Sequence, residues 1–114
     1  MSNIRGNISN NGNQGTIAIS GHFDFSVHKE FRKAYQSTRG AGMRFEVDLS
    51  SVDHMDSSAL GMLLLLREHA GGDKANVVLR NPSSTVERIL RIANFGKMFE
   101  ISGSNPEFIH SGKE

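Results

Sequence analysis

Apolar and polar residues alternate in the middle of the chain, from Phe45 to Leu49. Phe45, Val47 and Leu49 are apolar, and the two residues between them are acidic. This period of two predicts a β-strand with one buried face. Farther along, Ala59–Leu66 is apolar apart from Gly61, rich in leucine and free of β-branched residues. Such a run has high helix propensity, so we expect a buried strand followed by a helix.

The connection between this strand and this helix is polar. We expect a turn at Ser50–His54, followed by Met55 and then by Asp56-Ser57-Ser58. Asp and Ser are preferred at helix N-termini, because their oxygens accept hydrogen bonds from backbone N–H groups that lack a partner. The pair Gly71-Gly72 is the matching signal for the end of the helix. The pattern places two hydroxyls at the positive end of a helix, and we expect the function there.

The same reasoning assigns elements to the rest of the chain. Residues 4–8 and 15–20 are expected to form strands joined by a turn at 10–13, with a loop at 21–24. Ser26 is expected to cap a helix with the apolar stripe Val27, Phe31, Ala34, Tyr35 and Thr38. We expect further strands at 75–80 and 97–101 and a short helix at 105–109. A third main helix should begin with the capping box Ser84–Glu87, with Glu87 on its outer face.

Strands that alternate with helices predict a single α/β domain. Its sheet is expected to be mixed but largely parallel, with four to five strands and with the helices packed mainly on one face. The core of the domain should span about residues 15–101, with an N-terminal strand and turn at 1–14 and a frayed end at 111–114. The loops at 21–25, 50–57 and 81–84 would then share one edge, where open α/β sheets usually have their sites. The expected core includes Val47, Leu63, Leu66, Leu79, Val86 and Leu90.

Composition and charge narrow the possible functions. A chain of 114 residues is long enough for one domain and too short for two. The net charge of +1 gives no electrostatic reason to expect binding to nucleic acid or to a membrane surface. Cysteine is absent, which excludes disulfides and thiolate chemistry. The polar N-terminus does not resemble a signal peptide, and Ala59–Leu66 is too short to span a bilayer, so we expect a cytoplasmic protein.

Ser57 and Ser58 have two interpretations. In the first, one of the two serines simply caps the helix. In the second, a serine is phosphorylated, which adds about −1.5 to −2 charges that a helix N-terminus tolerates well. The apolar neighbours Met55, Leu60 and Met62 favour the second interpretation. An apolar surface around a small hydroxyl suits docking that one added charge disrupts.

Other chemistries fit the sequence less well. Asp48, Asp53 and Asp56 suggest a receiver-like domain, but the acidic pair that receivers need after the first core strand is replaced by Ser20-Gly21-His22. The five histidines lack zinc-ligand spacing, and the nucleophile motif G-x-S-x-G is absent near His54. We therefore expect neither an enzyme nor a metal or cofactor site. Asp24 is a separate case, because it could lie across the shared edge from Asp56.

The segment DLSSVDHMDSSALG at Asp48–Gly61, with the leucine-rich run after it, resembles the signature of STAS domains. Within that family it is most similar to the bacterial anti-sigma factor antagonists. The sequence GHFD at Gly21–Asp24 resembles the family's G-E-L/I-D, and VERILRIANFGKMFE resembles its third helix and the glycine turn after it. The resemblance extends from Gly15 to about Ile101.

This resemblance implies a partner switch without a cofactor. Unphosphorylated members of the family bind an anti-sigma factor that is also a serine kinase, and this frees a sigma factor. The kinase phosphorylates the serine after the motif's aspartate, here Ser57, and a PP2C-type phosphatase reverses the modification. The expected partner-binding residues are Asp24, Met55, Asp56, Ser58, Ala59, Leu60 and Met62.

The sequence departs from the family pattern at two places. His22 and Phe23 replace the usual acidic and aliphatic residues, and Ala59 stands where glycine is frequent. STAS domains also occur in stressosomes, transporters and lipid-transport complexes. The alternative is therefore a scaffold or accessory subunit that uses the same surface without phosphorylation.

Overall fold

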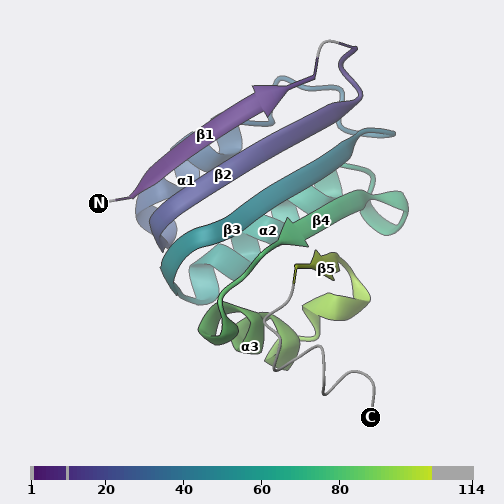
Figure 1. Cartoon of the computed structure of the whole chain (residues 1–114). Coiled ribbons are helices and arrows are strands. Elements are labelled where there is room, and N and C mark those ends of the chain that lie inside the picture. Colours follow the sequence, from purple (N-terminus) through teal and green to yellow (C-terminus); the bar gives the residue numbers. More distant parts are fainter. Residues whose placement is uncertain (1, 10, 104–114) are drawn as a thin grey trace.

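The computed structural model describes residues 2–9 and 11–103. This part of the chain contains five strands and three α-helices (Figure 1). The elements are β1 (Asn3–Ile8), β2 (Gln14–Phe23), α1 (His28–Lys33), β3 (Arg44–Met55), α2 (Ser57–His69), β4 (Asn76–Arg80), α3 (Ser84–Ile92) and β5 (Glu100–Ser102). It also contains the single-turn 3₁₀ helices η1 (Phe25–Val27), η2 (Gly72–Lys74) and η3 (Phe95–Lys97).

The strands form one mixed sheet in the order β1-β2-β3-β4-β5. β1 and β2 pair as an antiparallel hairpin, and every other neighbouring pair is parallel. Helices α1 and α2 contact each other and lie on one face of the sheet (Figure 1). The predicted α/β domain with a largely parallel sheet is confirmed.

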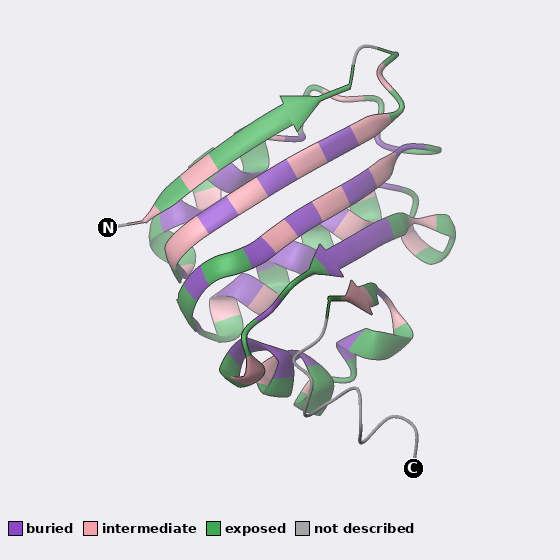
Figure 2. Ribbon diagram, in the orientation of Figure 1, coloured by how far each residue is buried: buried purple, intermediate pink, exposed green. Residues whose placement is uncertain are grey.

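The alternation that predicted β3 also places the core. Phe45, Val47 and Leu49 are fully buried, whereas Glu46 and Asp48 on the other face are half-buried. Figure 2 shows the same alternation as stripes along β2 and β3. All the predicted core residues are at most 1% exposed: Val47, Leu63, Leu66, Leu79, Val86 and Leu90. Burial of each such side chain stabilises the fold by about 1.5–3 kcal/mol.

Strands β2 and β3 are longer than the sequence predicts. The loop expected at 21–24 and the turn expected at Ser50–His54 are wrong, because both strands stay paired as far as Phe23 and Met55. The pairing tolerates the polar residues through register shifts between Ala18 and Ser20 and between Gly21 and His22. A shift of this kind adds residues to one strand and changes which face each side chain meets.

The caps of two helices also differ from the prediction. Asp24, not Ser26, caps the turn before α1, and that helix ends by Ala34. Helix α3 is capped by Ser83, whose hydroxyl accepts a hydrogen bond from the Val86 N–H. Because this cap lies one residue earlier than predicted, Glu87 is too far along the helix to complete a capping box.

The faces predicted for α3 are wrong at Glu87. We expected this residue on the outer face, but it is fully buried beside Val86 and Leu90. Its Oε2 accepts hydrogen bonds from Arg91 Nε, at 3.0 Å, and lies 2.8 Å from Arg91 Nη2. The pairing satisfies part of a carboxylate that burial would otherwise leave uncompensated.

The C-terminal prediction is confirmed only in part. β4 lies where a strand was expected, whereas Lys97 belongs to η3 and the last strand is limited to Glu100–Ser102. The helix expected at 105–109 and the frayed end expected at 111–114 lie outside the described residues.

Candidate functional site

The site begins where two neighbouring parallel strands end. Phe23, the last residue of β2, is the register partner of Met55, the last residue of β3. Asp24 and Asp56 therefore follow directly at the carboxyl edge of the sheet, on adjacent strands. This places Asp24 across the edge from Asp56, as the sequence suggested.

The two aspartates make the same local structure. Asp24 Oδ1 accepts hydrogen bonds from the Ser26 N–H, at 3.0 Å, and from the Ser26 hydroxyl, at 2.5 Å. Asp56 Oδ1 accepts from the Ser58 N–H, at 3.0 Å, and from the Ser58 hydroxyl, at 2.6 Å. Two Asp-x-Ser segments thus begin two helical segments side by side, and each carboxylate satisfies N–H groups that helix geometry leaves free.

These hydrogen bonds also set the charge of the edge. The Ser26 hydroxyl, and then the Ser26 N–H, lower the pKa of Asp24 below its usual value. The Ser58 hydroxyl is the main cause of the lowered pKa of Asp56, and the nearby Asp24 charge opposes that lowering. Both groups are carboxylates at neutral pH, so the edge carries two negative charges close enough to interact.

Two histidines stand on the strands beside these carboxylates. The rings of His22 and His54 lie 5.2 Å apart, and His22 Nε2 is 3.7 Å from Asp53 Oδ1. The charges of His22 and His54 contribute to the lowered pKa of Asp24. His22 is thus a neighbour of the site through its position on β2, where the family pattern has an acidic residue.

Ser57 and Ser58 have different environments. The Ser58 hydroxyl is occupied, because it donates to Asp56. Ser57 is the first residue of α2 and is exposed, and its hydroxyl has no hydrogen-bond partner among the described residues. The N-cap is Asp56, so the interpretation in which a serine caps this helix is wrong.

The other predicted partner-binding residues divide by burial. Asp56 is exposed, Asp24 and Leu60 are half-buried, and Ser58 is half-buried as well. Met55, Ala59 and Met62 are buried and belong to the hydrophobic core next to this edge. Their contact with a partner stays a prediction, and it would require a rearrangement or contact through the backbone.

Two exposed apolar residues were missed by the sequence analysis. Phe25, directly after Asp24, is 62% exposed, and Leu65 on α2 is also 62% exposed. A signal for Phe25 exists in the sequence, because Asp24-Phe25-Ser26 repeats the pattern of Asp56-Ser57-Ser58. Phe25 therefore occupies, after β2, the position that Ser57 occupies after β3.

The receiver-like interpretation is not supported by the position of Asp48. This residue lies within β3, where its Oδ1 accepts a hydrogen bond from the Ser50 N–H at 3.0 Å, and not at a strand end. Within residues 2–9 and 11–103, no three His, Asp or Glu side chains form a group suited to a metal ion. None of the helices in the described part of the chain is long and apolar enough to cross a membrane.

The fold and this edge define a small α/β domain whose candidate site lies at a strand–helix junction. The chain belongs to the STAS domain family, since residues 7–101 match the family model described as "Mlab, STAS domain". A STAS-domain containing protein of Pseudomonas aeruginosa (strain UCBPP-PA14) is 50% identical over 94 residues, which cover 82% of this chain and 93% of that protein.

Solved structures with low sequence identity share the fold. The anti-sigma factor antagonist SpoIIAA in its unphosphorylated form has a TM-score of 0.71 at 17% identity, covering 97% of this chain and 96% of that one. An anti-sigma factor antagonist from Mycobacterium paratuberculosis has a TM-score of 0.71 at 13% identity, covering 100% and 96%. The phosphorylated form of the Bacillus SpoIIAA has a TM-score of 0.62 at 15% identity, covering 98% and 100%.

Proposed function

We propose that this protein is an anti-sigma factor antagonist, a cytoplasmic, non-enzymatic binding module controlled by phosphorylation of Ser57. The unphosphorylated form binds an anti-sigma factor that is also a serine kinase, and so frees a sigma factor. The kinase phosphorylates Ser57 and ends the interaction, and a PP2C-type phosphatase restores it. The partner surface is the edge around Asp24, Asp56, Ser58 and Leu60, supported by Met55, Ala59 and Met62.

The observation that carries this proposal is the exposed hydroxyl of Ser57 at the first position of α2, which has no hydrogen-bond partner within residues 2–9 and 11–103. The adjacent Ser58 is the natural competitor for phosphate, but its hydroxyl is held by Asp56 at 2.6 Å. Phosphorylation of Ser57 therefore needs no local rearrangement, whereas phosphorylation of Ser58 requires its hydrogen bond to Asp56 to break first.

The electrostatics support a switch that acts on the surface and not on the fold. A phosphate at the first position of α2 lies at the positive end of the helix, so the folded state tolerates it, although Asp56 already accepts hydrogen bonds from the Ser58 and Ala59 N–H groups. The same group adds about −1.5 to −2 charges beside two carboxylates. A partner surface that accommodates the unmodified edge must then desolvate a dianion in an acidic environment, which costs binding energy.

The alternative function is a STAS scaffold or accessory subunit that uses this edge without phosphorylation. The matching family model is described as "Mlab, STAS domain", which names no sigma-factor pathway, so we keep this alternative. Intact-mass analysis of the protein purified from its own cells separates the two, with peptide mapping of any phosphorylated form. A phosphoryl group on Ser57 supports the switch, and a protein that stays unmodified under all growth conditions supports the scaffold.

A further inference from the structure

The outer face of α2 is unusually apolar for a surface helix. No charged residue occurs between Ser57 and Leu66. Leu64 is 36% exposed and Leu65 is 62% exposed on this face. Helix α3, by contrast, exposes Arg88 and Arg91. A helix that is apolar on all sides is normally covered on all sides, so this face of α2 suits contact with another molecule.

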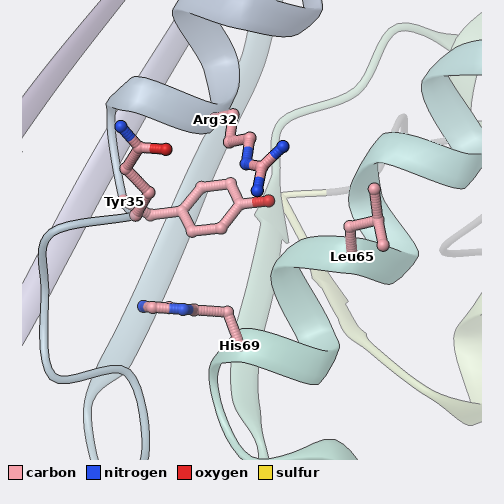
Figure 3. Close-up of a pocket in the computed structure, with 5 residues that line it drawn as sticks. Arg32, Tyr35, Leu65 and His69 are labelled. Carbon is pink, nitrogen blue, oxygen red and sulfur yellow. The ribbon is translucent and has the colours of Figure 1, made fainter.

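A groove between α1 and α2 adjoins this face. It consists of two hollows that share Arg32, Tyr35 and Leu65. The first hollow, about 100 Å³, lies between Phe25 and Met62 and is lined mainly by apolar atoms. The second, about 450 Å³, reaches His69 near the end of α2, and Figure 3 shows Tyr35, Leu65 and His69 around it. The groove therefore has an apolar end near Phe25 and a more polar end near His69.

The charge of the groove has one sign. Arg32 lies in both hollows, His28 lines the first and His69 the second, and no described residue that lines either one is a carboxylate. Lys29 and Lys33 are exposed on the same helix, α1, together with one carboxylate, Glu30. A ligand for this groove is therefore expected to be acidic.

Tyr35 and Arg32 supply hydrogen-bond donors at the same point. Burial raises the pKa of Tyr35, so its phenol keeps its proton at neutral pH. The Tyr35 hydroxyl points toward the Arg32 guanidinium, in the space between α1 and α2 (Figure 3). A guanidinium and a phenol together suit a carboxylate, which accepts hydrogen bonds from both.

We propose that the groove between α1 and α2 is a docking site for an acidic amphipathic helix of a partner protein. One aliphatic side chain of that helix enters the hollow between Phe25 and Met62. An Asp or Glu about one turn away pairs with Arg32 and Tyr35. Helix α2, with 13 residues, is roughly 20 Å long and offers contact to three turns of such a partner. Ser57 lines neither hollow, so the inference goes beyond the proposed switch, although Met62 belongs both to the groove and to the proposed partner surface.

The test starts with a displayed library of helical peptides selected on the full chain. The peptides that are enriched are expected to combine an aliphatic residue with an Asp or Glu three or four positions away. A fluorescein-labelled peptide from this set is then measured by anisotropy. Arg32→Glu and Leu65→Glu should each weaken its binding by about tenfold or more, the usual loss for a central contact. Higher salt should weaken it further.

Two controls separate this site from others. Ile92→Glu changes an apolar residue that is 76% exposed on α3 and should leave the affinity unchanged. Ser57→Asp should also leave it unchanged, which makes the groove distinguishable from the switch even if the switch proposal fails. Thermal unfolding of each variant shows that it remains folded, and Leu65→Ser replaces Leu65→Glu if the latter unfolds.

Several results would overturn the proposal. They are selection of basic or neutral peptides, no enrichment at all, or affinity that does not respond to Arg32→Glu and Leu65→Glu. Inorganic phosphate could displace the peptide while substitution of the peptide's aliphatic residue leaves the affinity unchanged. That result would assign the groove to small anions. A concentration-dependent dimer that Leu65→Glu dissociates would assign the face to a second copy of this chain.

Discussion

Glu87 is fully buried in α3, and Arg91, one turn later, pairs with it through Nη2 at 2.8 Å from Oε2. The other carboxylate oxygen, Oε1, has no partner among the described residues. The Arg91 side chain is 45% exposed, so only the Glu87 end of this ion pair is buried, and removal of the arginine leaves that buried carboxylate without its partner.

We expect Arg91→Ala to lower the free energy of unfolding by roughly 1–3 kcal/mol, because it leaves the Glu87 carboxylate buried without a partner. The double variant Glu87→Leu with Arg91→Ala should recover most of this loss. Urea unfolding of wild type and the two variants measures both effects. Equal stability of wild type and Arg91→Ala would contradict the view that Arg91 compensates the buried Glu87 carboxylate.

Core leucines give a second prediction about stability. Leu63 and Leu90 are fully buried, so Leu63→Ala and Leu90→Ala should each cost roughly 2–5 kcal/mol. Leu65→Ala is the matched control, because the same truncation at an exposed position should change stability by no more than about 0.5 kcal/mol. Chemical denaturation of the three variants tests the faces assigned to α2 and α3.

Glu46 predicts a pH dependence of stability. Its carboxylate accepts hydrogen bonds from Arg80 and Arg44, and these lower its pKa below the usual value of 4.5. Because the pKa is lower in the folded state, Glu46 stabilises the fold fully above its unfolded pKa, and this contribution is lost as the pH falls through the folded pKa. Unfolding of wild type and Glu46→Gln, measured from pH ~7 to ~3, should show a stability difference that shrinks below about pH 4.5. A constant difference would contradict the assignment.

The sign of the proposed switch is tested with three serine variants. Ser57→Asp adds a negative charge at the free end of α2 and should fold normally but bind the kinase-type partner about tenfold or more weakly. Ser57→Ala should bind like the unmodified protein and stay bound, because it cannot be phosphorylated. Ser58→Ala should still accept phosphate at Ser57.

Calorimetry with the partner and mass spectrometry of phosphate incorporation measure these outcomes. The proposal would be falsified if wild type and Ser57→Asp bound equally well while phosphate appeared only on Ser58. Loss of binding in Ser57→Ala would instead show that the hydroxyl itself is part of the interface.

Substitution of Leu60 tests whether this residue contributes to partner binding or to folding. It is half-buried on the first turns of α2, whereas Met62, two residues later, is buried. Leu60→Glu should therefore weaken partner binding with little change in the thermal midpoint, and Met62→Glu should lower the midpoint strongly. A large drop in the midpoint of Leu60→Glu would place this residue in the core and remove it from the proposed partner surface.

The sequence predicted the parts of the structure that local pattern determines. The alternation around Val47 and the leucine run after Ser58 were sufficient for β3, α2 and the core between them. The extension of β3 through His54 was not predictable, because the register shifts depend on pairing with β2 and have no local signal. Glu87 was assigned to the wrong face because charged residues are rarely buried, and only its pairing with Arg91 makes that burial tolerable.

At the candidate site, too, local pattern predicted some features, and others depended on tertiary packing. The motif located Asp56 and Ser57, and the expected edge brought Asp24 beside them. The exposure of Phe25 and Leu65 was missed, because an apolar residue in a pattern is assigned to the core unless the packing of its neighbours is known. Their exposure depends on how α1 and α2 pack together, which is a tertiary property.

The order of the strands in the sheet is also their order along the chain. Each strand from β2 to β5 therefore pairs with the one made just before it, and no strand has to insert between two that are already paired. The hairpin of β1 and β2 needs only local contacts, whereas each later strand must wait for the segment that crosses the face of the sheet. During synthesis such a domain can grow from one edge, and the β3–α2 junction that carries Ser57 forms only once α2 has packed over the sheet.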